Sequence, residues 1–224
     1  MDGRSSLGRP LLLGHRGARA IRGIAENTFE SFDHCMADGC DGFEFDVRLS
    51  ADGKAVVCHD PRARRKEIAR TEAAHLSFLP KFEEVLQRYG GSAFLDIELK
   101  VRGLEKITVQ MLRAHTVQRG FVVSSFLPEV LQTVRAEDIA IPLGLICETR
   151  RQLREWARLT VDYLIPHFRL ADSKLVAEVQ QAGKKILVWT VNDRREMVQF
   201  RDLGVDGLIS DDPALLRKTI ESVD

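Results

Sequence analysis

The sequence predicts a single α/β domain folded as a (β/α)8 TIM barrel, and two observations carry this prediction. Short β-rich runs recur along the chain, and segments with the periodicity of helices lie between them. Strands that alternate with helices imply parallel pairing through right-handed crossovers. Eight such units fill nearly the whole chain, which favours a closed barrel; a doubly wound open sheet is the alternative.

The eight expected strands are short runs rich in residues that favour β structure. No internal repeat or low-complexity linker interrupts the alternation, so residues 1–224 are expected to form one domain. The strands are expected at Leu11–His15, Gly42–Leu49, Ala93–Lys100, Phe121–Ser125, Pro142–Cys147, Tyr163–Pro166, Lys185–Val191 and Gly207–Ser210.

Four of the intervening segments space their apolar residues as a helix does. Asp172 and Asp193 are expected N-caps of the last two, since a carboxylate accepts hydrogen bonds from free backbone amides. Gly183 and Gly204 follow the same two segments, where a helix end favours glycine. The four segments are Thr28–Asp38, Leu104–Ala114, Leu175–Ala182 and Glu196–Leu203.

Composition and charge exclude several classes of function. The 33 basic residues balance the 33 acidic ones, which argues against a bulk electrostatic partner such as nucleic acid or an anionic membrane. Met1–Pro10 is polar and the apolar run Leu11–Leu13 is too short for a signal peptide or a membrane span, so a cytoplasmic location without membrane insertion is expected. The four cysteines contain no CxxC pair and are expected to be reduced.

Acidic residues inside two expected strands are the main functional signal. In Gly42–Leu49, Glu44 and Asp46 share one face with Arg48, because strand side chains alternate. In Ala93–Lys100, the inward face carries Asp96, Glu98 and Lys100. Buried carboxylates are costly unless they are paired or bind a metal. A salt-bridged layer with Arg48 and Lys100 is one interpretation; a site for a hard divalent cation, Mg²⁺ or Ca²⁺, is the favoured one.

Two histidines add acid–base chemistry to this site. His15 is the last residue of the first expected strand, and His59 ends the short apolar run that begins at Ala55. Active sites of barrels are built at such carboxyl ends of strands. Arg16 and Lys100 offer fixed positive charge to an anion, for which phosphate is the obvious candidate. The combination predicts phosphoryl-transfer chemistry.

Several short motifs together resemble the glycerophosphodiester phosphodiesterases, a family of TIM-barrel enzymes. They lie in the family's order from Leu11 to Asn192, and the set is specific although each piece alone is weak. The motifs are His15-Arg16-Gly17, Glu26-Asn27-Thr28, Gly42-Phe43-Glu44-Phe45-Asp46-Val47, Asp52-Gly53, Val57-Cys58-His59-Asp60, Glu98-Leu99-Lys100, Ser124-Ser125-Phe126 and Val188-Trp189-Thr190-Val191-Asn192.

The resemblance implies a role for each matching residue and a small-molecule glycerophosphodiester as substrate. Glu44, Asp46 and Glu98 would hold one divalent cation. His15 and His59 would form the acid–base pair, while Arg16 and Lys100 would bind the phosphate and Glu26 and Asn27 would support the site. Trp189, expected at the mouth of the barrel, is either a wall for the substrate or a core tryptophan.

The sequence departs from the family pattern in two places. Ala25 stands where the family usually has proline before its Glu-Asn-Thr motif. The segment Pro61–Leu79 is short and basic where the family often carries a longer insert over the substrate. That segment is either a solvated loop or a basic rim that attracts anionic substrates, and the more open mouth could admit bulkier diesters, including lysophospholipids.

The implied reaction is hydrolysis of a glycerophosphodiester to sn-glycerol 3-phosphate and an alcohol. Three alternatives remain: a lysophospholipase D-like enzyme that releases a cyclic phosphate, an inactive phosphodiester-binding barrel, and an unrelated sugar-phosphate barrel enzyme. His167 and Phe168 are weaker candidates to line the pocket. Ser124 and Ser125 lack the context of a serine nucleophile, and His34, His75 and His115 are expected to be surface or structural residues.

Overall fold

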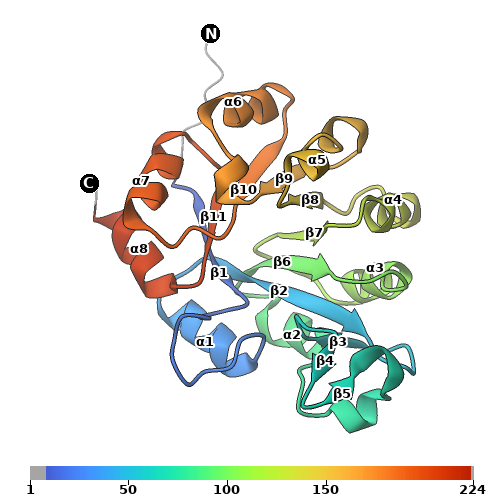
Figure 1. Cartoon of the computed structure of the whole chain (residues 1–224). Helices are drawn as coiled ribbons and strands as arrows, with labels where there is room; N and C mark the ends of the chain where they lie inside the picture. The colour runs from blue at the N-terminus through green and yellow to red at the C-terminus, as the bar shows by residue number, and fades with distance from the viewer. Residues whose placement is uncertain (1–8, 223–224) are drawn as a thin grey trace.

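The eight expected strands close into a parallel barrel in the computed structural model, which describes residues 9–222. Most of the polar segment Met1–Pro10 therefore lies outside the described residues. β1 pairs with both β2 and β11, which closes the ring and rules out the open sheet (Figure 1). The barrel strands are β1 (Leu11–His15), β2 (Gly42–Leu49), β6 (Phe94–Leu99), β7 (Phe121–Ser125), β8 (Leu143–Cys147), β9 (Tyr163–Pro166), β10 (Lys185–Val188) and β11 (Gly207–Ser210).

Helices surround the barrel and follow its strands in chain order. The four expected helices are confirmed within two residues at each end. Asp172 and Asp193 cap α6 and α7 as expected, through hydrogen bonds from Leu175 and from Arg195 and Glu196. The helices are α1 (Phe29–Ala37), α2 (Phe82–Tyr89), α3 (Glu105–Ala114), α4 (Pro128–Glu137), α5 (Arg150–Leu153), α6 (Ser173–Gln181), α7 (Arg194–Asp202) and α8 (Pro213–Glu221).

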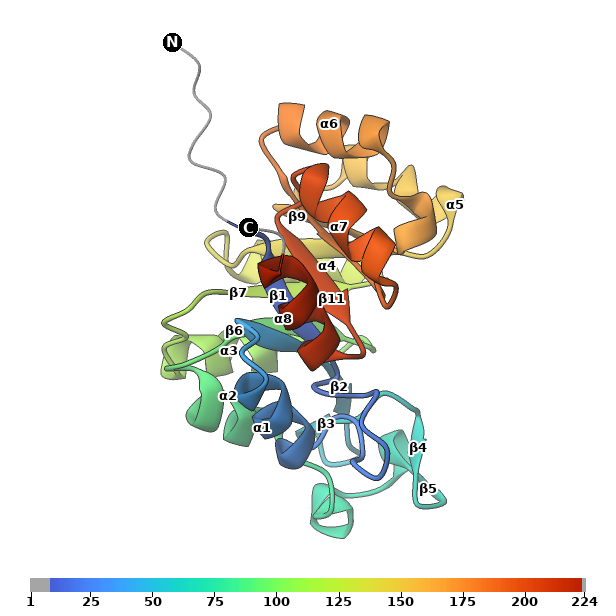
Figure 2. The same cartoon turned by 90° about the vertical axis from the view of Figure 1, so that its left-hand side faces the viewer.

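Three short strands follow β2 and were not among the eight expected barrel strands. β3 (Ala55–Val57) runs antiparallel to the end of β2, and β4 (Arg62–Ala63) forms a hairpin with β5 (Lys66–Glu67). The 3₁₀ helices Ile68–Arg70 and Ala73–Leu76 complete this excursion before α2. Figure 2 shows the β4–β5 hairpin standing away from the ring of helices. Two further 3₁₀ helices lie at Trp156–Arg158 and Phe168–Leu170.

Three expected strands are shorter than their sequence patterns: β6 loses Ala93 and Lys100, β8 loses Pro142, and β10 loses its last three residues. Lys185–Val191 leaves the strand ladder after Val188, and Trp189 instead forms an isolated bridge with His167. The indole therefore lies just beyond the carboxyl end of β10.

The core consists of two layers separated by the strands. The larger layer packs between barrel and helices, where the Phe32 ring stacks on Phe43 with 4.2 Å between centroids. The smaller layer fills the barrel interior with Leu13, Phe94, Val122, Ile146, Tyr163, Ile165, Leu187 and Ile209. Gly42 is required where β2 and β6 meet, since a Cβ there would lie 1.8 Å from the Phe94 carbonyl oxygen. These apolar side chains form a floor beneath the polar carboxyl ends of the strands.

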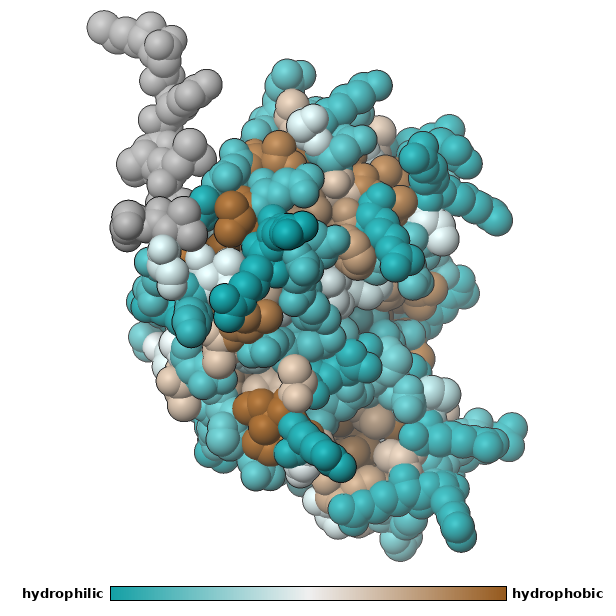
Figure 3. Space-filling model, turned by 60° about the vertical axis from the view of Figure 1, so that its left-hand side comes forward, coloured by the Kyte–Doolittle hydropathy of each residue, from teal (hydrophilic) through white to brown (hydrophobic). Residues whose placement is uncertain are grey.

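The surface and the thiols agree with a globular fold. Figure 3 shows a face dominated by hydrophilic side chains with small hydrophobic areas between them. All four cysteines are free thiols; Cys58 is half-buried and the other three are buried. The cytoplasmic location stays a prediction. Among residues 9–222, none of the helices combines the length and the apolar character that crossing a membrane requires.

Candidate active site

A cavity of about 380 Å³ opens at the carboxyl ends of the barrel strands, above the apolar floor. This is the face on which barrel enzymes build their active sites. Most of the expected site residues line this cavity: His15, Arg16, Glu44, His59, Glu98, Lys100 and Trp189. The rest of the lining is Asp96, Phe126, Ile146, Glu148, Ile165 and Ile209. The residues singled out from the sequence therefore converge on one cavity.

Three buried carboxylates meet at one side of the cavity. Glu44, Asp46 and Glu98 each offer an oxygen, and these oxygens lie within 4.8 Å of one another. β2 and β6 pair so that Glu44 lies beside Asp96 and Asp46 beside Glu98, which places all their side chains on the inward face. The expected acidic cluster is thus present.

The chemistry of this cluster fits a hard divalent cation. Glu44 Oε1 is buried and accepts no hydrogen bond from the described residues. Burial and then the charge of Asp46 raise the pKa of Glu98 to about 7, and burial with the same neighbour raises the pKa of Glu44 well above its usual range. Three oxygen donors that repel one another favour a bound cation, because its charge offsets both the burial and the repulsion.

Two cationic side chains hold part of the cluster. Lys100 Nζ lies 2.7 Å from Glu98 Oε1 and 3.2 Å from Asp46 Oδ1. Arg16 Nε lies 3.3 Å from Asp46 Oδ2. The interpretation as a salt-bridged layer is therefore correct for Lys100. It is wrong for Arg48, whose Nε donates to the His59 carbonyl oxygen at 2.7 Å.

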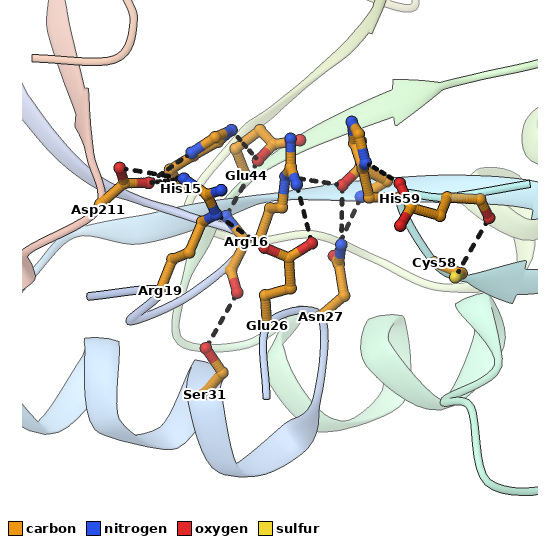
Figure 4. A network of polar contacts seen from close by, with 12 residues as sticks. His15, Arg16, Arg19, Glu26, Asn27, Ser31, Glu44, Cys58, His59 and Asp211 are labelled. Carbon is orange, nitrogen blue, oxygen red and sulfur yellow. Dashed lines mark hydrogen bonds and ion pairs between the residues drawn. The ribbon is translucent and has the colours of Figure 1, made fainter. Parts of the chain in front are cut away.

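The loop after β1 is shaped to present Arg16. Arg16 and Gly17 both have positive φ, 53° and 86°, and this turn directs the Arg16 amide to Glu44 Oε2 at 3.0 Å. Glycine is needed at 17 because a Cβ would lie 2.4 Å from Ser31 Oγ. Arg16 also donates to Glu26 Oε1 at 2.8 Å, so its guanidinium is fixed from two sides (Figure 4).

Asn27 connects the same loop to the acidic cluster. Its Nδ2 donates to Asp46 Oδ2 at 2.7 Å, and its Oδ1 accepts from the Asp46 amide at 3.2 Å. Asn27 adopts a φ of 57°, a left-handed conformation that asparagine tolerates better than most residues. Asn27 and Glu26 thus lie where a supporting role requires them.

His15 is held by an aspartate that the sequence did not single out. His15 Nδ1 lies 2.7 Å from Asp211 Oδ1, and His15 Nε2 lies 3.9 Å from Glu44 Oε2. Burial raises the pKa of Asp211, but the hydrogen bond and charge of His15, with Asn192 and Arg19, outweigh it and lower the pKa to about 2. Asp211 is therefore ionised, accepts the Nδ1 proton of His15 and leaves Nε2 toward the cavity.

His59 reaches the cavity by a different route from the one expected. It does not end a barrel strand: it follows β3, which runs antiparallel to β2 and carries the chain back toward Asp46. The Cys58 amide donates to the Asp46 carbonyl oxygen at 2.9 Å, which fixes the position of the next residue. His59 Nδ1 lies 2.8 Å from Asp60 Oδ1, and burial lowers the pKa of His59.

The remaining wall of the cavity is aromatic. Trp189 packs against Phe126, with 5.7 Å between ring centroids, and donates from Nε1 to the Ile165 carbonyl oxygen at 3.0 Å. The indole is half-exposed and lines the cavity, which agrees with a wall rather than a core residue. His167 packs on its outer side, with 5.3 Å between centroids, and neither His167 nor Phe168 lines the cavity.

Asp96 lies at the base of the cavity and is fully buried. Its Oδ1 accepts from Ser124 Oγ at 2.5 Å, and burial raises its pKa to about 7. Ser125 Oγ donates to the Leu99 carbonyl oxygen at 2.8 Å. Both serine hydroxyls are thus engaged as donors, in agreement with the exclusion of a serine nucleophile.

The other candidates lie where the sequence placed them. His34 and His75 are exposed, and His115 lies 3.3 Å from Glu83. Sequence reasoning missed Asp211 and Glu148 and named Phe126 only as part of a motif, without a role. Each of the three closely follows the end of a barrel strand. Position after a strand was the signal that could have drawn attention to them.

Comparisons with known proteins agree with the geometry. The sequence model of the Glycerophosphoryl diester phosphodiesterase family matches residues 15–78 and 94–215. A glycerophosphodiester phosphodiesterase of Caldanaerobacter subterraneus subsp. tengcongensis is 28% identical over 237 residues, which cover 93% of this chain and 96% of that protein.

Solved structures extend the similarity to the fold. A Silicibacter pomeroyi structure has a TM-score of 0.86 at 22% identity, covering 96% of this chain and 94% of that chain. An Oleispira antarctica phosphodiesterase in complex with the product sn-glycerol-3-phosphate has a TM-score of 0.83 at 27% identity, covering 95% of this chain and 97% of that chain.

Proposed function

Since the chain belongs to the glycerophosphoryl diester phosphodiesterase family and is a phosphoric diester hydrolase, we propose that it hydrolyses glycerophosphodiesters by a metal-dependent mechanism with two histidines. The products would be sn-glycerol 3-phosphate and an alcohol. The Oleispira antarctica relative, whose structure contains sn-glycerol-3-phosphate as product, supports this choice of product. We base the mechanism on two imidazoles, each held at Nδ1 by a carboxylate, beside the acidic cluster.

Glu44, Asp46 and Glu98 would hold one divalent cation, Mg²⁺ or Ca²⁺. The ion would supply positive charge that offsets the charge of the phosphate. The buried Glu44 Oε1, which has no hydrogen-bond partner among the described residues, supports this assignment.

Arg16 and Lys100 would bind the phosphate from the protein side. Both line the cavity, and both are held by carboxylates that keep them in place. Neutral walls of Trp189 and Phe126 would enclose one organic arm of the diester. These contacts orient the phosphorus between the two histidines.

The two imidazoles would move the protons of the reaction. One accepts a proton from the nucleophile at its free Nε2 while the new oxygen–phosphorus bond forms. The other donates a proton to the alcohol oxygen as the opposite oxygen–phosphorus bond breaks, so the two histidines exchange charge and the alcohol leaves neutral. Asp211 and Asp60 hold the Nδ1 protons, so both Nε2 atoms remain available.

Two nucleophiles remain open, and they define the alternative activity. Water attacks in direct hydrolysis, whereas attack by the neighbouring glycerol hydroxyl expels the alcohol and leaves a cyclic phosphate. The second route, with lysolipids as substrates, corresponds to a lysophospholipase D-like enzyme.

A coupled assay for sn-glycerol 3-phosphate on a panel of glycerophosphodiesters, with Mg²⁺ and Ca²⁺ in turn, tests the proposal. Phosphorus NMR of the same reactions distinguishes a cyclic product from a phosphomonoester. Release of neither product from any diester would contradict the proposed function.

A further inference from the structure

A second groove of about 240 Å³ lies beside the cavity, between the loop after β1 and the β4–β5 hairpin. His59 is the residue that lines both spaces. We propose that this groove holds the leaving alcohol of the diester and that Arg64 selects alcohols that carry a negative charge. This inference rests on the proposed function and names the substrate class within it.

The shared histidine explains why the alcohol would lie in the groove. A diester has two organic arms on one phosphorus, and the arms point in different directions. The cavity beside Trp189 accommodates one arm, and the groove on the other side of His59 is the adjoining space that accommodates the second. An arm that crosses His59 places the bridging oxygen within reach of the imidazole.

The two acidic residues of the groove already have hydrogen-bonding partners. Glu26 accepts from Arg16 and Arg19 at 2.8 and 2.7 Å. Asp60 lies 2.8 Å from the His59 ring. The charge of Glu26 is therefore offset by two arginines, and Glu26 repels an anionic alcohol less strongly.

Arg64, by contrast, has no carboxylate partner among residues 9–222. Its guanidinium lies over the Phe78 ring, 4.4 Å from the centroid. Stacking on an aromatic face holds the charged plane in one orientation and leaves its N–H groups free to bind an anion. Arg62 lines the same groove, and its Glu67 partner is 3.9 Å away.

The Phe78 ring on which Arg64 stacks is anchored on the body of the protein. Phe78 and Leu79 pack on a small apolar cluster of Val56, Ile68 and Leu76, all of which are buried. Arg64 and Arg65 occupy the turn with positive φ values of 46° and 65°. Stacking on the anchored Phe78 ring lowers the entropic cost of ordering Arg64 around a ligand.

Two diesters that differ only in one carboxylate make the sharpest test. Glycerophosphoserine is glycerophosphoethanolamine with a carboxylate added to the alcohol. The wild-type enzyme should prefer the serine diester in kcat/KM. This preference should weaken as salt is added, since exposed charges are screened.

Arg64→Gln should reduce the serine-to-ethanolamine ratio of kcat/KM by about tenfold, the value of one hydrogen bond to a charged group. Arg64→Lys should restore part of the ratio. Arg65→Gln is the matched control: it removes the same charge from the same turn, but Arg65 does not line the groove, so the ratio should not change.

Calorimetric binding of both diesters to a His15→Ala background separates this inference from the proposed function, because it needs no turnover. Weaker binding of the serine diester alone in His15→Ala/Arg64→Gln supports the inference even if hydrolysis fails. Equal effects of Arg64→Gln on the two diesters, or the same loss of preference in Arg65→Gln, would overturn it.

Discussion

Asp211 Oδ1 lies 2.7 Å from His15 Nδ1, although 196 residues separate the two along the chain. The contact exists because β1 and β11 are neighbours in the closed barrel. Asn192 Nδ2 and Arg19 NH1 also donate to Asp211 Oδ2, at 2.7 and 3.2 Å, which fixes the carboxylate. Asp211 thus links the ring of His15 to the segments that carry Arg19 and Asn192.

Asp211→Asn should lower kcat by about 10- to 100-fold, the cost of a lost charged hydrogen bond that orients a reacting group. Asp60→Asn should lower kcat much less, because Asp60 is exposed and its bond to His59 competes with water. Steady-state kinetics of both variants test the contrast. Equal losses in the two variants would contradict it.

His15→Ala and His59→Ala should each lower the rate by about 10²–10⁴, the usual contribution of a positioned acid or base. His75→Ala is the matched control, since His75 is exposed on the excursion after β3. Single-turnover rates with a glycerophosphodiester measure the effect. Turnover near the wild-type rate in either catalytic variant would remove that histidine from the mechanism.

Removal of the divalent cation with EDTA should abolish activity, and addition of Mg²⁺ or Ca²⁺ should restore activity. The added cation should also raise Tm, because a ligand that binds the folded state stabilises that state. Glu44→Gln should remove most of this rise in Tm. The metal-free variant should be at least as stable as the metal-free wild type, since burial and repulsion raise the pKa of Glu44.

Glu148→Gln provides the control for that experiment, because Glu148 lines the cavity outside the acidic cluster. Its melting temperature should still rise with the cation. Full activity of protein shown by metal analysis to be free of cations would rule out the metal-dependent mechanism.

The Arg9–Asp41 ion pair, far from the cavity mouth, should make stability depend on pH. Burial raises the pKa of Asp41, but hydrogen bonds from Arg9 and the Leu12 amide outweigh it and lower the pKa. The unfolded chain then binds more protons than the folded one, so the stabilisation is present above about pH 4 and is lost at lower pH.

Asp41→Asn should therefore have a lower Tm than the wild type at pH 7, and the difference should shrink toward pH 3. Glu72→Gln, at an exposed carboxylate without an ion pair among residues 9–222, should show no such trend. Thermal unfolding monitored by circular dichroism gives both series. A constant difference for Asp41→Asn across this range would contradict the assignment.

Residues with strong periodicity were predictable from the sequence. Glu44 and Asp46 alternate with Phe43 and Phe45, and this pattern alone places the two acids on the inward face. The parallel pairing of β2 and β6 then brings Glu98 to the same cluster. Local alternation and chain order are sufficient for this part of the site.

Long-range partners and short strands were not predictable in the same way. Nothing in the three residues Ala55–Val57 specifies that they pair antiparallel with β2, so the path of His59 was misjudged. A single aspartate after β11 gives no indication that it contacts His15, because that contact depends on closure of the barrel. Arg48 shares a face with Asp46, but its Nε donates to the His59 carbonyl oxygen instead of pairing with the cluster.

The antiparallel pairing of β3 with β2 makes residues 50–81 an exchangeable unit of the molecule. Only the last three residues of β2 pair with this unit, and none of the other seven barrel strands does. A longer or shorter segment between Asp60 and Lys81 would therefore leave the register of the barrel unchanged. Grafting such segments from relatives offers a route to alter the choice of alcohol while the metal ligands and His15 stay in place.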